Sequence, residues 1–200
     1  MACRYRLSCL RPLVRGGLAA LILACAGPAR ADQTIDGVTI ASEVTQGPRT
    51  LKLVGAGVRT KFVFKVYVAA LYALDPSHDA RRLIEGPGAR RLHLQMLRDI
   101  DSKTLDEAMR DELKANHSAE DVRALKPAVE RLSQLLRGTD RLREGDTIDL
   151  EIDSDAVAIL YNRQDKGRID DPRLPAALMR VWLGDNPAQT SLKQALLGLR

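Results

Sequence analysis

Cysteine is missing from nearly all of this 200-residue chain. Its three cysteines, Cys3, Cys9 and Cys25, all lie within the first 25 residues. The rest of the chain can therefore form no internal disulfide and offers no thiolate to a metal ion. Its stability must come from a packed core.

Acidic residues are missing from the first 31 residues, which contain five arginines. An apolar run at 17–26 follows the basic segment and is too short for a stable membrane anchor. Residues 29–31, Ala-Arg-Ala, form a small-x-small signal peptidase site. We therefore expect residues 1–31 to be a signal peptide, cleaved after Ala31, and residues 32–200 to be one periplasmic domain. The alternative is a lipoprotein signal ending at Cys25, but Leu23 occupies a position where a small residue is expected.

An excess of either charge is also missing once this segment is set aside. Removing its five arginines from the 31 basic residues leaves 26, which equals the number of acidic residues. A balanced charge gives no electrostatic reason to expect nucleic acid or an anionic membrane as a partner.

Familiar catalytic motifs are missing too. Residues 55–60, Gly-Ala-Gly-Val-Arg-Thr, lack the third glycine of a dinucleotide loop and the Lys-Ser/Thr ending of a phosphate loop. No GxSxG or HExxH sequence occurs. The three histidines are far apart in sequence, and the paired aspartates are typical of solvated turns. We therefore expect no cofactor and no metal site.

The hydrophobic pattern alternates between strand and helix periods. Strands are predicted near 35–40, 50–74, 91–97, 147–152 and 156–161. Helices are predicted near 79–85, 105–116, 118–138, 173–183 and 191–199, with Ser77, Ser102 and Ser118 as caps of the first three. This order predicts an α+β domain with an antiparallel sheet and helices on one face.

The segment 51–74 is the most informative part of the chain. It is rich in strand-forming residues, yet Arg59 follows the glycine pair Gly55 and Gly57. Glycines inside a strand mark a bulge, a bend or a close approach to the backbone. A buried arginine must be paired, because an isolated buried charge is very costly. Its partner is either an internal carboxylate or an acidic ligand.

Two sequence features resemble the chalcone isomerase family, in particular its bacterial secreted chalcone isomerase-like branch. One is Gly-Ala-Gly-Val-Arg at 55–59 followed by Phe-Lys-Val-Tyr-Val-Ala-Ala-Leu-Tyr at 64–72. The other is the tail Val-Trp-Leu-Gly-Asp-Asn-Pro at 181–187. The resemblance extends over the whole chain after the signal segment. It implies an open-faced β-sandwich, in which a layer of helices covers one face of an antiparallel sheet and a ligand cleft lies between the layers.

The resemblance also implies roles for three residues. In plant enzymes of the family, a strand arginine polarises the substrate carbonyl for an intramolecular Michael addition, supported by a threonine and a tyrosine. Arg59 matches the arginine, Tyr67 replaces the threonine, and Tyr72 matches a further tyrosine. This replacement is more like the non-catalytic, fatty-acid-binding members. We therefore expect Arg59, Tyr67 and Tyr72 to bind a small apolar carboxylate such as a fatty acid. The alternatives are an isomerase that uses Arg59, or a structural or interaction module.

Spacing limits this assignment. Arg59 and Tyr67 would lie roughly 26 Å apart on an unbroken strand, at ~3.3 Å per residue, so they share a ligand only if the chain turns back between them. The residues at 60–61, Thr-Lys, are a poor turn sequence. Alternation along the segment also predicts an apolar face that includes Phe62 and Phe64. In the competing interpretation Arg59 forms a structural ion pair.

Overall fold

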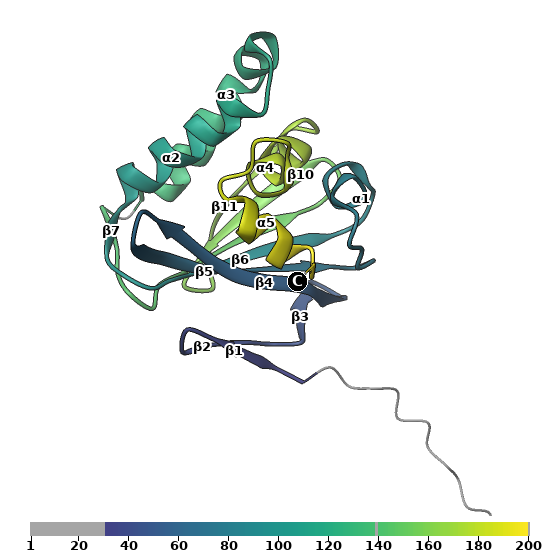
Figure 1. Cartoon of the computed structure of the whole chain (residues 1–200). Helices are drawn as coiled ribbons and strands as arrows, with labels where there is room; N and C mark the ends of the chain where they lie inside the picture. Colours follow the sequence, from purple (N-terminus) through teal and green to yellow (C-terminus); the bar gives the residue numbers. More distant parts are fainter. Residues whose placement is uncertain (1–30, 139, 200) are drawn as a thin grey trace, which may run out of the picture.

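A seven-stranded antiparallel sheet forms the centre of the protein. The computed structural model describes residues 31–138 and 140–199; residues 1–30, with most of the expected signal peptide, lie outside them. The strand order is β11-β10-β9-β6-β5-β4-β3 (Figure 1). The strands are β3 (Glu43–Gln46), β4 (Arg49–Lys61), β5 (Phe64–Ala73), β6 (Arg90–Met96), β9 (Thr147–Ile152), β10 (Ala156–Tyr161) and β11 (Gln164–Asp170).

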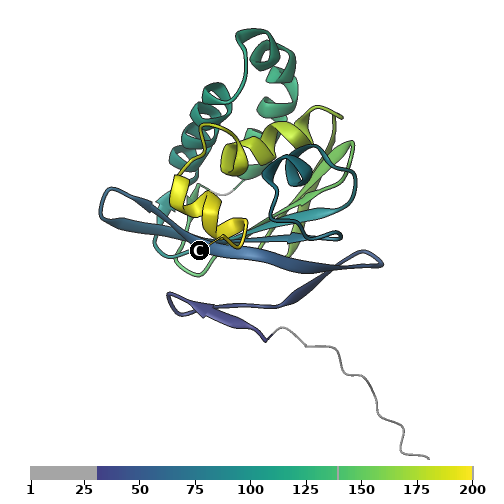
Figure 2. The same ribbon diagram turned by 45° about the vertical axis from the view of Figure 1, so that its right-hand side comes forward.

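All the helices lie on one face of this sheet, as Figures 1 and 2 show. They are α1 (Ala80–Glu85), α2 (Ser102–Ala115), α3 (Ala119–Leu136), α4 (Leu174–Leu183) and α5 (Thr190–Leu196). A short ladder of β7 (Ile100–Asp101) and β8 (Arg141–Leu142) lies beside α2 and α3. This arrangement confirms the α+β class and the layer of helices on one face. Within the described residues, no helix is long and apolar enough to cross a membrane.

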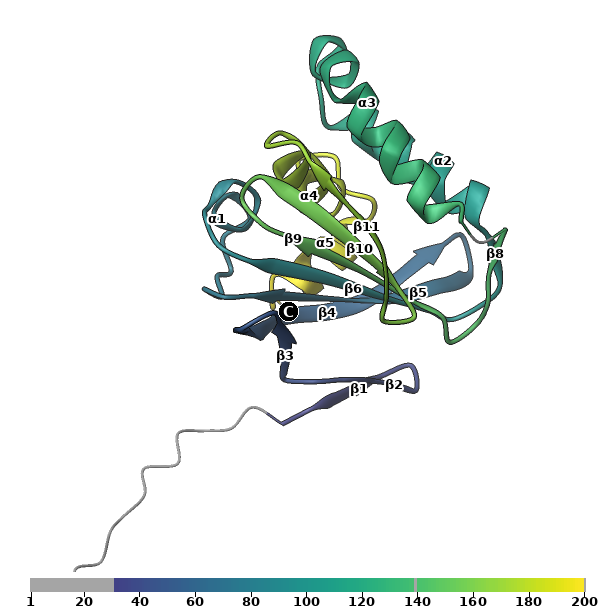
Figure 3. The same ribbon diagram turned by 180° about the vertical axis from the view of Figure 1, so that it is seen from behind.

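The other face of the sheet is partly covered by a small hairpin, β1 (Gln33–Ile35) and β2 (Val38–Ile40). Figure 3 shows it lying beneath the sheet. The described residues therefore form two cores. The larger one lies between the sheet and the helices, and the smaller one lies under the hairpin.

The break in the long strand segment is a tight turn at Phe62 and Val63. It closes β4 and β5 into a hairpin, so that Arg59 lies directly opposite Tyr67. The predicted apolar face through Phe62 and Phe64 is therefore wrong, because both residues are exposed. The turn was not predicted because Phe-Val contains none of the residues that favour hairpin loops.

Of the bulge, bend and close approach that the glycine pair left open, the structure contains a close approach and a bulge. A β-carbon on Gly55 would lie 2.1 Å from the carbonyl oxygen of Ala195, and one on Gly57 would lie 2.6 Å from the Ala195 β-carbon. Helix α5 therefore packs with its backbone almost against β4. A register shift between Leu53 and Gly55 also makes this a bulge.

The helix caps were predicted with mixed success. Ser118 caps α3, since its hydroxyl accepts a hydrogen bond from the Asp121 amide. Ser77 does not cap α1; Asp79 does, and Ser77 accepts a hydrogen bond from the Asp79 amide. Ser102 is the first residue of α2 instead of its cap. In each wrong case an aspartate one or two positions away is the residue at the helix boundary.

Candidate functional site

The hairpin brings Arg59 and Tyr67 onto adjacent strands, and both lie on the helix side of the sheet. Their side chains line a small cavity between β4, β5, α2 and α4. The sequence could place these residues together only if the chain reversed between them. The turn at Phe62 and Val63 is that reversal.

Arg59 has an internal carboxylate as its partner. One guanidinium nitrogen, Nη2, lies 3.3 Å from Oε1 of Glu112 on α2. The other, Nη1, donates to the Thr60 carbonyl at 3.1 Å and to Oε1 of Gln189 at 3.4 Å. The same Gln189 oxygen accepts a hydrogen bond from the Thr60 amide at 2.8 Å. The sequence left open whether Arg59 pairs with an internal carboxylate or with an acidic ligand. In the structure it pairs with an internal carboxylate, that of Glu112.

The Arg59–Glu112 contact is loose and partly accessible. The two side chains keep 17% and 22% of their exposure, and the pair makes a single contact at 3.3 Å. Burial raises the pKa of Glu112 above its ordinary value, although Arg59 and Lys61 act in the opposite direction. Burial at this position therefore disfavours the charged form of Glu112.

Tyr67 is fully enclosed by the core. Its hydroxyl accepts a hydrogen bond from the indole N–H of Trp182 at 3.1 Å. Burial raises the pKa of Tyr67, while Trp182 and Arg59 act to lower it. Tyr67 is thus a buried, neutral phenol whose hydroxyl is held by Trp182.

The cavity is small and mainly apolar. Its volume is about 70 Å³, roughly the space of two water molecules at ~30 Å³ each. Arg59 and Glu112 supply charge at one part of its wall. Lys61 and Thr104 also line the wall, and its apolar part includes Val66, Ile100, Leu105, Met109, Val181 and Trp182.

Tyr72 does not belong to this site. It lies in the smaller core under the β1–β2 hairpin, and its hydroxyl donates to the Ala41 carbonyl at 3.0 Å. Tyr67 and Tyr72 are five residues apart on one strand, so their side chains point to opposite faces of the sheet. The expectation that Tyr72 lines the ligand site with Arg59 is corrected on this ground.

Two residues of the site were not predicted from the sequence. Glu112 lies on a helix more than fifty residues from Arg59 along the chain, and nothing in its local sequence distinguishes it from other helical glutamates. Trp182 belongs to the tail motif, but its bond to Tyr67 depends on how α4 crosses the sheet. Both contacts are products of tertiary packing.

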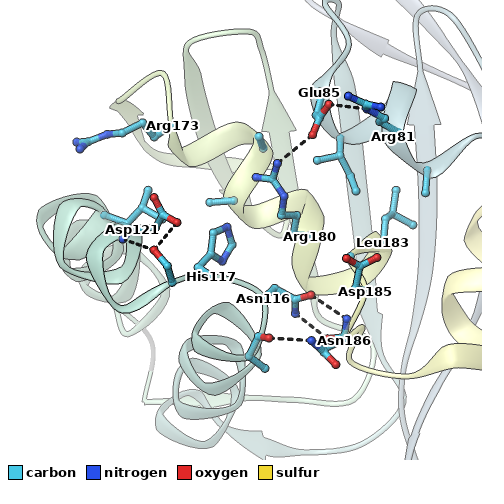
Figure 4. A pocket seen from close by; sticks show the side chains of 18 of the residues that line it. Arg81, Glu85, Asn116, His117, Asp121, Arg173, Arg180, Leu183, Asp185 and Asn186 are labelled. Carbon is cyan, nitrogen blue, oxygen red and sulfur yellow. Dashed lines mark hydrogen bonds and ion pairs between the residues drawn. The ribbon is translucent and has the colours of Figure 1, made fainter.

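A much larger hollow, of about 1010 Å³, lies between α1, α4 and the α2–α3 connection (Figure 4). Its wall carries cations and anions that pair with each other: Glu85 accepts from both Arg81 and Arg180. Asp121 accepts from Ser118. These paired charges share the wall with apolar residues such as Ile84, Leu125 and Leu183, so the hollow is more polar than the Arg59 cavity.

The tail motif forms one side of this hollow and serves the architecture. The Asn116 side chain donates to the Glu112 and Asn186 carbonyls and accepts from the Asn186 amide. A β-carbon on Gly184 would lie 2.4 Å from the Asn116 side-chain oxygen. These contacts join the end of α2 to the α4–α5 connection. Among the described residues, no three His, Cys, Asp or Glu side chains are grouped so that they could hold a metal ion.

The fold is similar to that of a known binding protein. The crystal structure of a fatty-acid binding protein from Arabidopsis thaliana superposes with a TM-score of 0.67 at 14% identity, covering 83% of this chain and 95% of that one. A comparison with curated protein sequences gives no match. A family profile described as chalcone isomerase-like matches residues 32–198. Together with the seven-stranded sheet and its layer of helices, this match shows that the chain belongs to the chalcone isomerase-like family.

Proposed function

We propose that this protein binds a small apolar carboxylate, such as a fatty acid, without catalysing a reaction, and that it does so in the periplasm. The proposed ligand has a charged head for Arg59 and a hydrocarbon tail for the apolar wall. The fatty-acid binding protein that shares the fold supports this assignment, as does the signal-like start of the chain.

The Arg59–Glu112 contact is the observation that carries the proposal. It puts a carboxylate against an arginine beside a mainly apolar cavity. A ligand carboxylate at the same guanidinium would make an equivalent charge-assisted contact. Glu112 therefore acts as an internal substitute for the ligand head group.

The cavity must enlarge to accept a hydrocarbon tail, because about 70 Å³ holds only a few methylene groups. Helix α2 is the element that has to move. It carries Leu105, Met109 and Glu112, so an outward shift of α2 removes the internal carboxylate and opens the apolar wall together.

Substitutions of the two paired residues should affect acid binding in opposite directions. Arg59→Met removes the cation, so affinity for laurate should fall at least tenfold, because a hydrogen bond to a charged group contributes about 1.5–3 kcal/mol. Glu112→Gln removes the competing carboxylate, so affinity should rise several-fold. Isothermal titration of delipidated protein with laurate measures both.

Glu107→Gln is the matched control for this pair. It makes the same chemical change on the same helix, but at an exposed residue whose partner, Lys103, is also exposed. Its laurate affinity should equal that of the wild type. If Glu112→Gln weakened binding as much as Arg59→Met, the ion pair would be part of the architecture and the proposal would fail.

We also expect no isomerase activity. Tyr67 stands where the plant enzymes have a threonine. Its hydroxyl accepts a hydrogen bond from Trp182, and its side chain lines the small cavity. A hydroxychalcone should therefore cyclise at its spontaneous rate in the presence of the protein. Stereoselective product that disappears in Arg59→Met would instead establish a lyase, and chiral chromatography of the product distinguishes the two results.

A further inference from the structure

Both phenylalanines of the chain, Phe62 and Phe64, are exposed to solvent. They flank Val63 at the closed end of the β4–β5 hairpin, which projects from the sheet at the left of Figure 2. Phe62 retains 90% of its exposure, Val63 84% and Phe64 55%. Three adjacent apolar side chains at one projecting turn form a small hydrophobic wedge, which we call the hairpin tip (residues 62–64).

The first residue of the hairpin tip, Phe62, has a backbone conformation that phenylalanine rarely adopts. Phe62 has a φ of 57°, in the left-handed region that glycine or asparagine adopts far more easily. Two-residue hairpin loops favour glycine at such a position. Neither folding nor solubility accounts for an exposed phenylalanine here, so a contact made by the side chain is the reason that remains.

Cations surround the hairpin tip. Lys61 and Lys65 flank it in sequence, and the guanidinium of Arg98 lies 4.6 Å from the centre of the Phe64 ring. Two acidic residues lie near these cations: Asp36 pairs with Lys65 at 2.6 Å, and Glu112, the partner of Arg59, also interacts electrostatically with Lys61. The charge balance of residues 32–200 therefore hides a local excess of positive charge at the hairpin tip, contributed by Lys61 and Arg98.

We propose that the hairpin tip docks on the surface of a lipid bilayer that contains anionic lipids. Phe62, Val63 and Phe64 would enter the interfacial region, and the surrounding cations would meet the head groups. A protein partner fits less well, because a stable protein interface buries ~800 Å² on each side, far more than three residues at a turn supply.

Docking in this way also orients the cavity. Lys61 lies both beside the hairpin tip and in the wall of the Arg59 cavity. The cavity wall would then face the bilayer surface, from which an apolar acid could enter. Docking itself does not depend on the identity of the ligand.

Vesicle co-sedimentation tests the proposal. The full-length mature protein should sediment with vesicles of phosphatidylcholine and phosphatidylglycerol, far less with phosphatidylcholine alone, and less as salt is added. Phe62→Gly/Val63→Ser should lower binding to the mixed vesicles at least roughly tenfold, since two apolar side chains are lost. Glycine suits the backbone at residue 62, so this variant should melt no lower than the wild type and should keep its affinity for dissolved laurate.

Leu74→Ser is the matched control, since Leu74 is also exposed and follows the opposite end of the same strand. It should sediment like the wild type. Equal sedimentation of the hairpin-tip variant and the wild type would overturn the proposal. Self-association of the lipid-free protein would also overturn it, if analytical ultracentrifugation shows that the hairpin-tip variant abolishes this association. The hairpin tip would then bind a second copy of the chain. The effect of Arg59→Met on laurate binding tests only the proposed function and does not test the docking of the hairpin tip on a bilayer.

Discussion

Gly55→Ala should destabilise the protein by about 3 kcal/mol, near the upper end of what overpacking usually costs. Its β-carbon would lie 2.1 Å from the Ala195 carbonyl oxygen, 2.7 Å from the Gly198 nitrogen and 2.9 Å from the Leu196 carbonyl oxygen. All three are backbone atoms, so no side-chain rotation relieves the contact. The backbone of Gly55 itself is not in the left-handed region, so the effect is steric.

The melting temperature should fall by roughly 6–12 °C, because each kcal/mol shifts a domain of this size by about 2–4 °C. Gly138→Ala is the control, since its nearest atom would be 3.4 Å away, and it should change little. Laurate affinity should fall as well in Gly55→Ala, since α5 begins beside Gln189, which holds Arg59 and the Thr60 amide. A Gly55→Ala protein with unchanged melting would mean that α5 does not pack closely on β4.

The neighbouring glycine offers a rescue experiment. In Gly57→Ala the new methyl would collide with the β-carbon of Ala195, at 2.6 Å, and more mildly with Leu192 at 3.3 Å. Adding Ala195→Gly removes the principal obstacle. The double variant should therefore recover much of the stability lost in Gly57→Ala, and thermal melting of the four combinations measures the coupling.

The parts of the fold that follow local rules could be predicted from the sequence. The glycine pair indicated a bulge, a bend or a close backbone approach, and Ser118 indicated a helix start; the structure has a bulge and a close approach at the glycines and a helix that begins after Ser118. Strand β11 was missed because its sequence, Gln-Asp-Lys-Gly-Arg-Ile-Asp, is charged and has low strand propensity. Its pairing with β10, not its own preference, makes it a strand.

The site was only partly predictable. Residues that are five apart on one strand point to opposite faces of the sheet, so the sequence alone could have shown that Tyr67 and Tyr72 do not share a site. The pairing of Arg59 with Tyr67 required a turn that local composition did not indicate. Glu112 and Trp182 reach the cavity from helices that pack on the sheet from distant parts of the chain, and such contacts depend on the tertiary structure.

A buried aspartate on α2 sets how this helix can move. Asp106 has 0% exposure and lies between α2 and α3. It accepts hydrogen bonds from Arg110 at 3.2 Å, from Arg137 Nε at 3.0 Å and from the Ser133 hydroxyl. Because the last two donors come from α3 and its end, α2 and α3 are held together. The opening of the Arg59 cavity should therefore displace α2 and α3 as a pair.

Asp106→Asn should destabilise the protein by about 3 kcal/mol at neutral pH, since removing one partner of a buried ion pair costs about 3–5 kcal/mol and both arginines here keep some contact with water. Burial alone would raise the pKa of Asp106, but the hydrogen bonds from Ser133 and Arg137 and the charge of Arg110 hold it below its ordinary value. A lowered folded-state pKa means that this stabilisation is fully present above the unfolded-state pKa, near ~3.9, and is lost as the pH falls through the folded value.

The stability gap between wild type and Asp106→Asn should therefore be constant from about pH 7 to about pH 5 and shrink below about pH 4. Urea unfolding at several pH values measures it. Asp111→Asn, the same change at an exposed residue of the same helix, should alter stability by less than ~0.5 kcal/mol. A gap that widened on acidification would show that Asp106 is protonated in the folded protein, and that the charge does not hold α2 to α3.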